Sequence, residues 1–236
     1  MKKLSCILFD LDGTLLPMDL DTFLNAYFSL LLKHLAQNGY DYPRASAALK
    51  SGIHRMMTND GSQKNEMAFW SAFEEVYGGL DETAAGVLDA FYRDEFSKLQ
   101  EVCGFDARAV LCVKKAREMA DRIILATNPV YPRTATEQRA DWAGCPASLF
   151  DDITAFENSS YAKPSLNYYK EILAKYQLDP ASCLMIGNDV GDDMVAARLG
   201  MRVFLLTPCL INKENLSIDH IPHGDYDALL DFLDTL

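Results

Sequence analysis

The sequence predicts an α/β protein in which a parallel sheet carries helices on both faces and a small helical domain is inserted after the first strand. Short apolar runs, bounded by polar or turn-forming residues as buried strands are, recur at 5–9, 122–126, 152–156, 182–186 and 202–206. Between the later runs lie stretches with helical spacing, at 131–144 and 165–178. Alternation of strand and helix is typical of a parallel sheet covered on both faces.

The segment from about residue 18 to residue 100 interrupts this alternation because it contains no convincing strand. It holds several helical patterns, at 19–39, 65–79 and 82–99. The first pattern begins at an aspartate and ends at a glycine, as helices often do. The aromatic residues of these helices are expected to form the core of a small bundle. We therefore expect an α-helical domain at 18–100 that is inserted into an α/β core at 1–17 and 101–236.

Composition limits the possible partners and the compartment. The 236 residues include 34 acidic and 22 basic ones, and the formal charge of -12 would repel nucleic acid and anionic membranes. The six cysteines lack zinc-ligand spacing and are expected to be reduced thiols. The first apolar run ends at Asp10, too soon for an export signal. We expect a cytoplasmic protein with no nucleic-acid or membrane partner, of unknown oligomeric state.

Polar residues follow four of the predicted strands directly. In chain order they are Asp10 and Asp12, Thr127 and Asn128, Lys163, and then Asp189 and Asp193. Loops at the carboxyl ends of parallel strands meet at one edge of the sheet, so these residues are expected to converge there.

The residue types found at these positions suit metal-assisted phosphoryl transfer. Carboxylates such as Asp10 and Asp189 bind Mg²⁺ through oxygen. The Thr127 hydroxyl, its neighbouring amides and the Lys163 ammonium supply donors for phosphoryl oxygens. Residues two apart in a strand face the same side, so Asp10 and Asp12 can face one substrate. One acid can then attack while the other handles the proton.

These motifs, in this order, resemble the haloacid dehalogenase superfamily in its phosphatase form. The resemblance rests on "DLDGT" at 10–14, "TN" at 127–128, "KP" at 163–164 and the acid cluster after "MIG" at 185–187. It covers the α/β core from end to end and implies a Rossmann-like sheet with a helical cap that closes over the site. The sequence departs from the common family pattern in one place, because Asn188 separates Gly187 from the first acid, Asp189.

The resemblance also implies a role for each residue. Asp10 would be the nucleophile that forms an aspartyl-phosphate, and Asp12 the general acid and base. Dehalogenating members lack this second acid, so its presence favours phosphate esters. Thr127, the amide of Asn128 and Lys163 would hold the phosphoryl group. Magnesium would be held by the side chain of Asp10, the backbone carbonyl of Asp12 and the side chain of Asp189.

Several alternatives remain open at the level of residues. Asp193 would orient a metal-bound water or Lys163, with Asp192 as a rival for that role. Taken singly, Asp189, Asp193 and Thr127 could be helix caps, and Lys163 an ordinary lysine before a helix. Basic residues of the insert could contact substrate or be solvated charges; these are Arg44, Arg55 and Lys64. Tyr131 and Arg133 could reach the leaving group.

Three functions follow from this reading. The leading one is a Mg²⁺-dependent phosphatase (a hydrolase) of a small phosphorylated metabolite, such as a sugar or organic acid phosphate. The same site could serve a sugar phosphomutase, in which the aspartyl-phosphate returns its phosphoryl group to a sugar. The third is a non-catalytic regulatory protein that binds a phosphorylated ligand, which the intact pair of acids disfavours.

Overall fold

The computed structural model describes residues 4–78 and 83–236. Across these residues a six-stranded, fully parallel sheet forms, in the order β3-β2-β1-β4-β5-β6. The strands are β1 (Cys6–Phe9), β2 (Ile123–Leu125), β3 (Asp152–Ile153), β4 (Cys183–Gly187), β5 (Arg202–Leu206) and β6 (His223–Gly224). The first strand of the chain, β1, therefore lies in the middle of the sheet, between β2 and β4.

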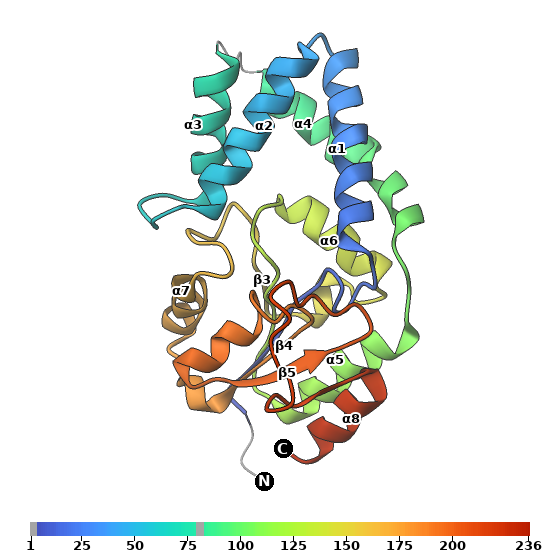
Figure 1. Ribbon diagram of the computed structural model, residues 1–236, viewed down its shortest axis with the longest axis vertical. Coiled ribbons are helices and arrows are strands. Elements are labelled where there is room, and N and C mark those ends of the chain that lie inside the picture. Colours follow the sequence, from blue (N-terminus) through green and yellow to red (C-terminus); the bar gives the residue numbers. More distant parts are fainter. Residues whose placement is uncertain (1–3, 79–82) are drawn as a thin grey trace.

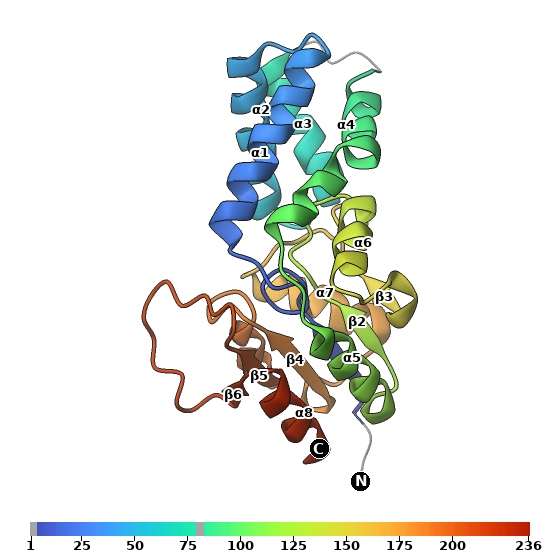
Figure 2. The ribbon, with the colours of Figure 1, turned by 90° about the vertical axis from the view of Figure 1, so that its right-hand side faces the viewer.

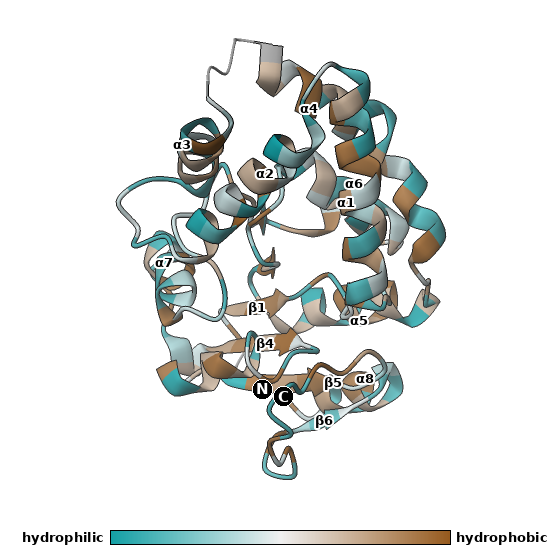
Figure 3. Cartoon of the chain, turned by 45° about the horizontal axis from the view of Figure 1, so that its top comes forward, coloured by the Kyte–Doolittle hydropathy of each residue, from teal (hydrophilic) through white to brown (hydrophobic). Residues whose placement is uncertain are grey.

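The three central strands β1, β2 and β4 are apolar along their whole length because both faces of the sheet are buried there. Successive side chains point to opposite faces, so Ile7 and Phe9 join one hydrophobic core while Cys6 and Leu8 join a second. Brown colouring marks the apolar strands β1, β4 and β5 in Figure 3. Strands of this kind read as continuous apolar runs, which is why the sequence revealed them.

Helices cover both faces of the sheet. The first core contains residues of α5 (Ala107–Met119), α6 (Arg133–Trp142) and α8 (Tyr226–Asp234). The second contains residues of α7 (Leu166–Tyr176) and of the short 3₁₀ helix η4 (Met194–Leu199). Two further 3₁₀ turns are η2 (Ala147–Leu149) and η3 (Pro180–Ser182). The Rossmann-like fold class is thus confirmed.

A layer of helices lies beyond the carboxyl ends of the strands (Figures 1 and 2). It consists of α1 (Leu20–Gln37), α2 (Tyr42–Met57), α3 (Asn65–Tyr77), α4 (Thr83–Asp94) and the 3₁₀ helix η1 (Phe96–Val102). Asp19 caps α1 by accepting the Thr22 N–H at 2.8 Å, which satisfies one free donor of its first turn. Aromatic side chains hold the layer together: Phe91 packs edge-on against Tyr27 and Phe96.

The chain enters and leaves this helical layer through two neighbouring segments. Met18, on the way in, forms an antiparallel bridge with Cys103, on the way out. The Gly104 N–H donates to the carbonyl oxygen of Pro17 at 2.6 Å. The connections before α1 and after η1 therefore run side by side.

The structure differs from the sequence expectations in three places. A sixth strand, β6, pairs with β5 through Leu205 and His223 and lies outside the five apolar runs expected to be strands. The third strand is shorter than the expected 152–156 and ends at Ile153 because its partner β2 ends at Leu125. The helix expected at 82–99 is divided into α4 and η1, and Glu82 lies outside the described residues, as do residues 1–3.

Two further findings concern composition. All six cysteines are free thiols, four of them buried. None of the helices in the described part of the chain is long and apolar enough to span a bilayer.

Candidate active site

The register of the three central strands sets the position of the site. Phe9 pairs with Leu125 of β2 and with Ile186 of β4, so the residues that follow these strands leave the sheet at the same level. The Asp10 N–H donates to the Ile186 carbonyl at 2.9 Å, which holds Asp10 against the end of β4. The sequence led us to expect that strand alternation would turn Asp10 and Asp12 to the same side. The strand ends at Phe9, however, so alternation does not set the directions of these two side chains.

Asp10 shares a buried lysine with Asp193. The Lys163 Nζ lies 2.9 Å from Asp10 Oδ1 and 2.6 Å from Asp193 Oδ1, and all three side chains are at most one-tenth exposed. Burial alone lowers the pKa of Lys163, but Asp10 and Asp193 outweigh burial and keep its pKa well above the ordinary value. The lysine is therefore a fixed positive charge against the Asp10 carboxylate.

Thr14 and Asn188 support Asp10 from the other side. The buried Thr14 Oγ1 lies 3.1 Å from Asp10 Oδ2 and 3.0 Å from Asn188 Oδ1, and it can donate its proton to one of them. Asn188 Nδ2 donates to the Cys209 carbonyl at 2.7 Å. Gly13 makes this approach possible, because a Cβ there would lie 2.3 Å from Asn188 Nδ2 and its φ of +81° disfavours other residues.

Asp12 has a different partner from Asp10. Its Oδ2 forms an ion pair with Arg139, whose side chain is fully buried on α6 and whose guanidinium stacks on the Tyr131 ring at 4.2 Å. The other oxygen, Oδ1, is buried and finds no hydrogen-bond partner in the described residues. Burial raises the pKa of Asp12, and Arg139 offsets part of that rise. An oxygen without a partner in such surroundings suits a carboxyl group that carries a proton.

Thr127 and Asn128 lie where the second strand ends. The backbone carbonyl of Thr127 accepts hydrogen bonds from Thr154 Oγ1 at 2.7 Å and from the Tyr168 hydroxyl at 3.0 Å. Both partners fix the backbone and leave the Thr127 side chain facing the cavity. Asn128 Oδ1 accepts the Lys163 N–H at 3.3 Å, which ties the second and third predicted motifs together.

The acidic residues that follow β4 have different hydrogen-bond partners. The Asp193 Oδ2 accepts the Asp189 N–H at 3.0 Å while its Oδ1 contacts Lys163, so Asp193 and not Asp192 touches the lysine. Asp189 Oδ1 accepts the N–H groups of Gly191 at 2.7 Å and Asp192 at 3.0 Å. Gly187 leaves room for Asp193, since a Cβ there would lie 2.1 Å from Asp193 Oδ2.

The charge balance here fits a bound divalent cation. Five carboxylates line this end of the site, and within the described part of the chain only two buried cations, Lys163 and Arg139, face them. Burial and the neighbouring charge of Asp189 raise the pKa of Asp192 to about 6. A bound cation would offset this concentration of negative charge. No group of three or more acidic, histidine or cysteine side chains in the described residues forms a ready metal cage. The expected set does not need one, because it combines two side chains with a backbone carbonyl.

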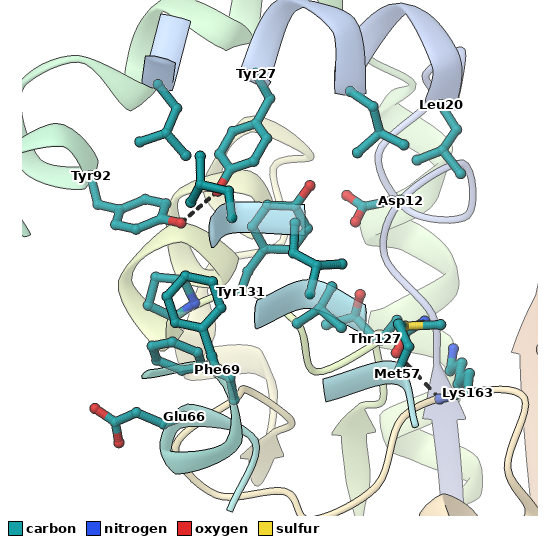
Figure 4. A pocket seen from close by; sticks show the side chains of 18 of the residues that line it. Asp12, Leu20, Tyr27, Met57, Glu66, Phe69, Tyr92, Thr127, Tyr131 and Lys163 are labelled. Atoms are coloured by element: carbon teal, nitrogen blue, oxygen red, sulfur yellow. Dashed lines mark hydrogen bonds between the residues drawn. The ribbon is translucent and has the colours of Figure 1, made fainter. Parts of the chain in front are cut away.

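A cavity of about 510 Å³ joins these residues to the helical layer. All seven predicted site residues line it: Asp10, Asp12, Thr127, Asn128, Lys163, Asp189 and Asp193. Figure 4 shows Asp12, Thr127 and Lys163 on one side of the cavity, with Phe69, Tyr27 and Tyr92 on the other. The residues expected from the sequence thus share one cavity, and their roles remain a prediction.

Sequence reasoning missed Arg139 and did not single out Asn188 as a contact of Thr14. Arg139 lies in "TEQRADW", where a charge on a helix normally faces solvent, and no spacing marks it as buried. Of the basic candidates, Arg55 pairs with Glu75 at 2.8 Å and Lys64 with Glu171 at 3.1 Å, and neither lines the cavity. Arg44 donates to the Tyr77 carbonyl and Arg133 pairs with Glu137, whereas Tyr131 does line the cavity.

Comparisons with known proteins agree with this geometry. The family model described as haloacid dehalogenase-like hydrolase matches residues 4–200. A search of the curated proteins found no match.

Solved structures of low sequence identity share the fold over almost their whole length. A 2-haloacid dehalogenase from Pseudomonas syringae superposes with a TM-score of 0.64 at 16% identity, covering 98% of each chain. A HAD phosphatase from Thermococcus onnurineus gives 0.59 at 15% identity, again with 98% of each chain. YfnB from Bacillus subtilis, solved with magnesium bound, gives 0.56 at 19%, with 99% of this chain and 100% of that one.

Proposed function

The chain belongs to the haloacid dehalogenase-like hydrolase family, and we propose that this enzyme is a magnesium-dependent phosphatase of a small phosphorylated metabolite. One observation carries the proposal. A carboxylate held by a buried lysine, Asp10, shares a cavity with a second acid, Asp12, that has its own cationic partner. Two carboxyl groups in different surroundings can take different roles, one as nucleophile and one as proton carrier.

In the proposed reaction, an Asp10 oxygen attacks phosphorus and the bond to the leaving oxygen breaks. Asp12, protonated, gives its proton to that oxygen, so that the alcohol leaves neutral. Water then attacks the aspartyl-phosphate, Asp12 accepts a proton from the water, and inorganic phosphate and free Asp10 result. The unpartnered Asp12 Oδ1 supports this assignment because it is the oxygen that can carry the proton.

The remaining residues bind and orient the phosphoryl group. We assign its oxygens to the Thr127 hydroxyl, the Asn128 amide and the Lys163 ammonium, with Asp193 fixing the lysine. Magnesium would be held by the side chains of Asp10 and Asp189 and by the Asp12 backbone carbonyl. When bound, it neutralises charge on the phosphoryl oxygens and on Asp10.

The proposal extends to specificity and compartment. Asp12 favours phosphate esters over halogenated acids, and the likeness to a dehalogenase structure is one of fold. We assign residues 18–100 as the cap domain that closes over the site. The six free thiols support a reducing compartment such as the cytoplasm.

The test is phosphate release from a panel of phosphate monoesters, with Mg²⁺ and after its removal by a chelator. We expect Asp10→Asn to lower the rate by at least about a thousandfold, because the nucleophile is lost. Asp21→Asn, in the exposed first turn of α1, is the matched control and should retain full activity. Equal activity of Asp10→Asn and the control would overturn the mechanism. Isomerisation of a hexose phosphate without phosphate release would instead establish the phosphomutase.

A further inference from the structure

The two ends of the cavity differ in chemistry. The strand-edge end is formed by Asp10, Asp12, Thr127, Lys163 and Asp189. The helical end is formed by large apolar side chains: Leu24, Phe28, Ile53, Phe69, Trp70 and Phe156. A phosphoryl group at the strand-edge end would point the rest of its molecule into the helical end. The lining of the helical end therefore determines which leaving groups fit.

The helical end is mostly hydrocarbon and offers few hydrogen-bond donors. Its walls come from α1, α2, α3 and α4, from the segment after β2 and from the loop that follows β3, and they are mainly aliphatic or aromatic. Its acceptors are mainly the carboxylates Glu66, Asp89 and Glu157. The hydroxyls of Tyr27 and Tyr92 lie 2.7 Å apart and bond to each other (Figure 4). A sugar would bury several hydroxyls here against hydrocarbon, and each unpaired hydroxyl is costly.

Positive charge is also lacking. Among the described residues, Lys163 is the only lysine or arginine that lines the cavity, and it already contacts Asp10 and Asp193. The acids Glu66, Asp89 and Glu157 line the cavity as well, and Figure 4 shows Glu66 on the side away from Asp12 and Lys163. A second phosphate or a carboxylate on the substrate would find no counter-ion and would meet like charges.

We propose that the substrate is the phosphate monoester of a largely apolar alcohol, alkyl or aryl, that carries no negative charge and whose hydrocarbon part fills the helical end of this cavity. This inference rests on the proposed phosphatase function and narrows its substrate class. Burial of the hydrocarbon supplies binding energy in proportion to the apolar area removed from water. It replaces the expectation of a sugar or organic acid phosphate.

A matched series of esters tests the proposal on the wild-type enzyme with Mg²⁺. The series is ethyl phosphate, n-hexyl phosphate, 6-phosphonooxyhexanoate and glucose 6-phosphate. We expect kcat/KM for the hexyl ester to exceed that for the ethyl ester at least about tenfold, because four more methylenes are buried. We expect it to exceed that for 6-phosphonooxyhexanoate by at least about tenfold too, because the six-carbon chain is of equal length and a carboxylate replaces its terminal methyl.

A variant pair locates the effect in the cavity. Ile53→Arg places a cation in the wall contributed by α2, and Val76→Arg places one on α3, outside the cavity at a side chain that is 40% exposed. We expect Ile53→Arg to shift the ratio of kcat/KM between hexyl phosphate and 6-phosphonooxyhexanoate about tenfold or more towards the carboxylate. Val76→Arg should leave the ratio within about twofold of wild type. The ratio is read on folded protein, checked by thermal unfolding.

The outcomes separate this inference from the proposed function. Higher kcat/KM for glucose 6-phosphate or 6-phosphonooxyhexanoate than for hexyl phosphate overturns the substrate class and leaves the phosphatase intact. Equal rates for ethyl and hexyl phosphate also overturn it. No phosphate release from any ester, including 4-nitrophenyl phosphate, overturns the phosphatase and with it this inference.

Discussion

The two ends of the cavity are held in place by different kinds of interaction. At the strand-edge end, backbone register and buried ion pairs fix the side chains, as between Lys163 and Asp10. At the helical end, shape arises from apolar side chains packed between helices and loops, such as Phe69 of α3 against Phe156 of the loop after β3. The positions of the side chains at the first end depend on the order of the sheet, whereas the second end is shaped by individual side chains. On the proposed function, reaction chemistry and substrate choice would thus be separated in space.

The largest effect should come from the buried lysine at the strand-edge end. Lys163→Met leaves Asp10 and Asp193 close together without their cation, so we expect a loss of about 3–5 kcal/mol in the free energy of unfolding. Phosphate release should fall by more than about a hundredfold. Lys175→Met is the matched control, because Lys175 pairs with Asp152 at 2.7 Å but is half exposed. Its cost should stay within about 1 kcal/mol by denaturant unfolding. Equal losses in the free energy of unfolding for the two variants would show that the buried ion pairs of Lys163 do not fix the strand-edge end.

A smaller and more selective effect is expected at Arg139. Arg139→Gln removes the partner that orients Asp12, so proton transfer to the leaving group should suffer. We expect kcat/KM to fall about a hundredfold on an alkyl phosphate, whose leaving alcohol needs a proton, and far less on 4-nitrophenyl phosphate, which leaves readily as an anion.

The control for this prediction is Arg117→Gln, which breaks the partly exposed pair with Asp151 at 2.7 Å. It should lower neither rate by more than about twofold. A fall of the same size on both esters after Arg139→Gln would argue against a role in proton transfer.

The smallest effect is expected from a basic residue of the helical layer. Arg55 pairs with Glu75 at 2.8 Å, and both side chains are about half exposed. Arg55→Gln should change the free energy of unfolding by no more than about 0.5 kcal/mol. Steady-state kinetics should show no change in the preference between neutral and anionic esters. A selective loss of activity on the anionic ester would place Arg55 in the cavity. The helical end would then carry a cation, and its difference from the strand-edge end would be smaller.

The sequence predicts the strand-edge end well because position along the chain determines position in space there. Asp10, Thr127 and Asp189 each follow a buried strand, and parallel strands end at one edge. The short strand β6 had no such signal, because its two residues, a histidine and a glycine, show no apolar pattern. Arg139 was hidden for another reason, since its burial depends on Asp12, 127 positions earlier in the chain. Contacts between distant helical side chains follow from packing, which periodicity does not reveal.

The neighbouring connections at Met18 and Cys103 have a consequence for how such a protein can diversify. Because the chain leaves the core and returns to it at one point, the residues between Met18 and Cys103 form a single inserted segment whose two ends are adjacent. A longer or shorter inserted segment could be accommodated if its two ends matched this pair of chain ends. The strand order of the sheet would then stay the same. The junction is therefore a position at which a new segment can be inserted, so that substrate selectivity can change while the α/β core is retained.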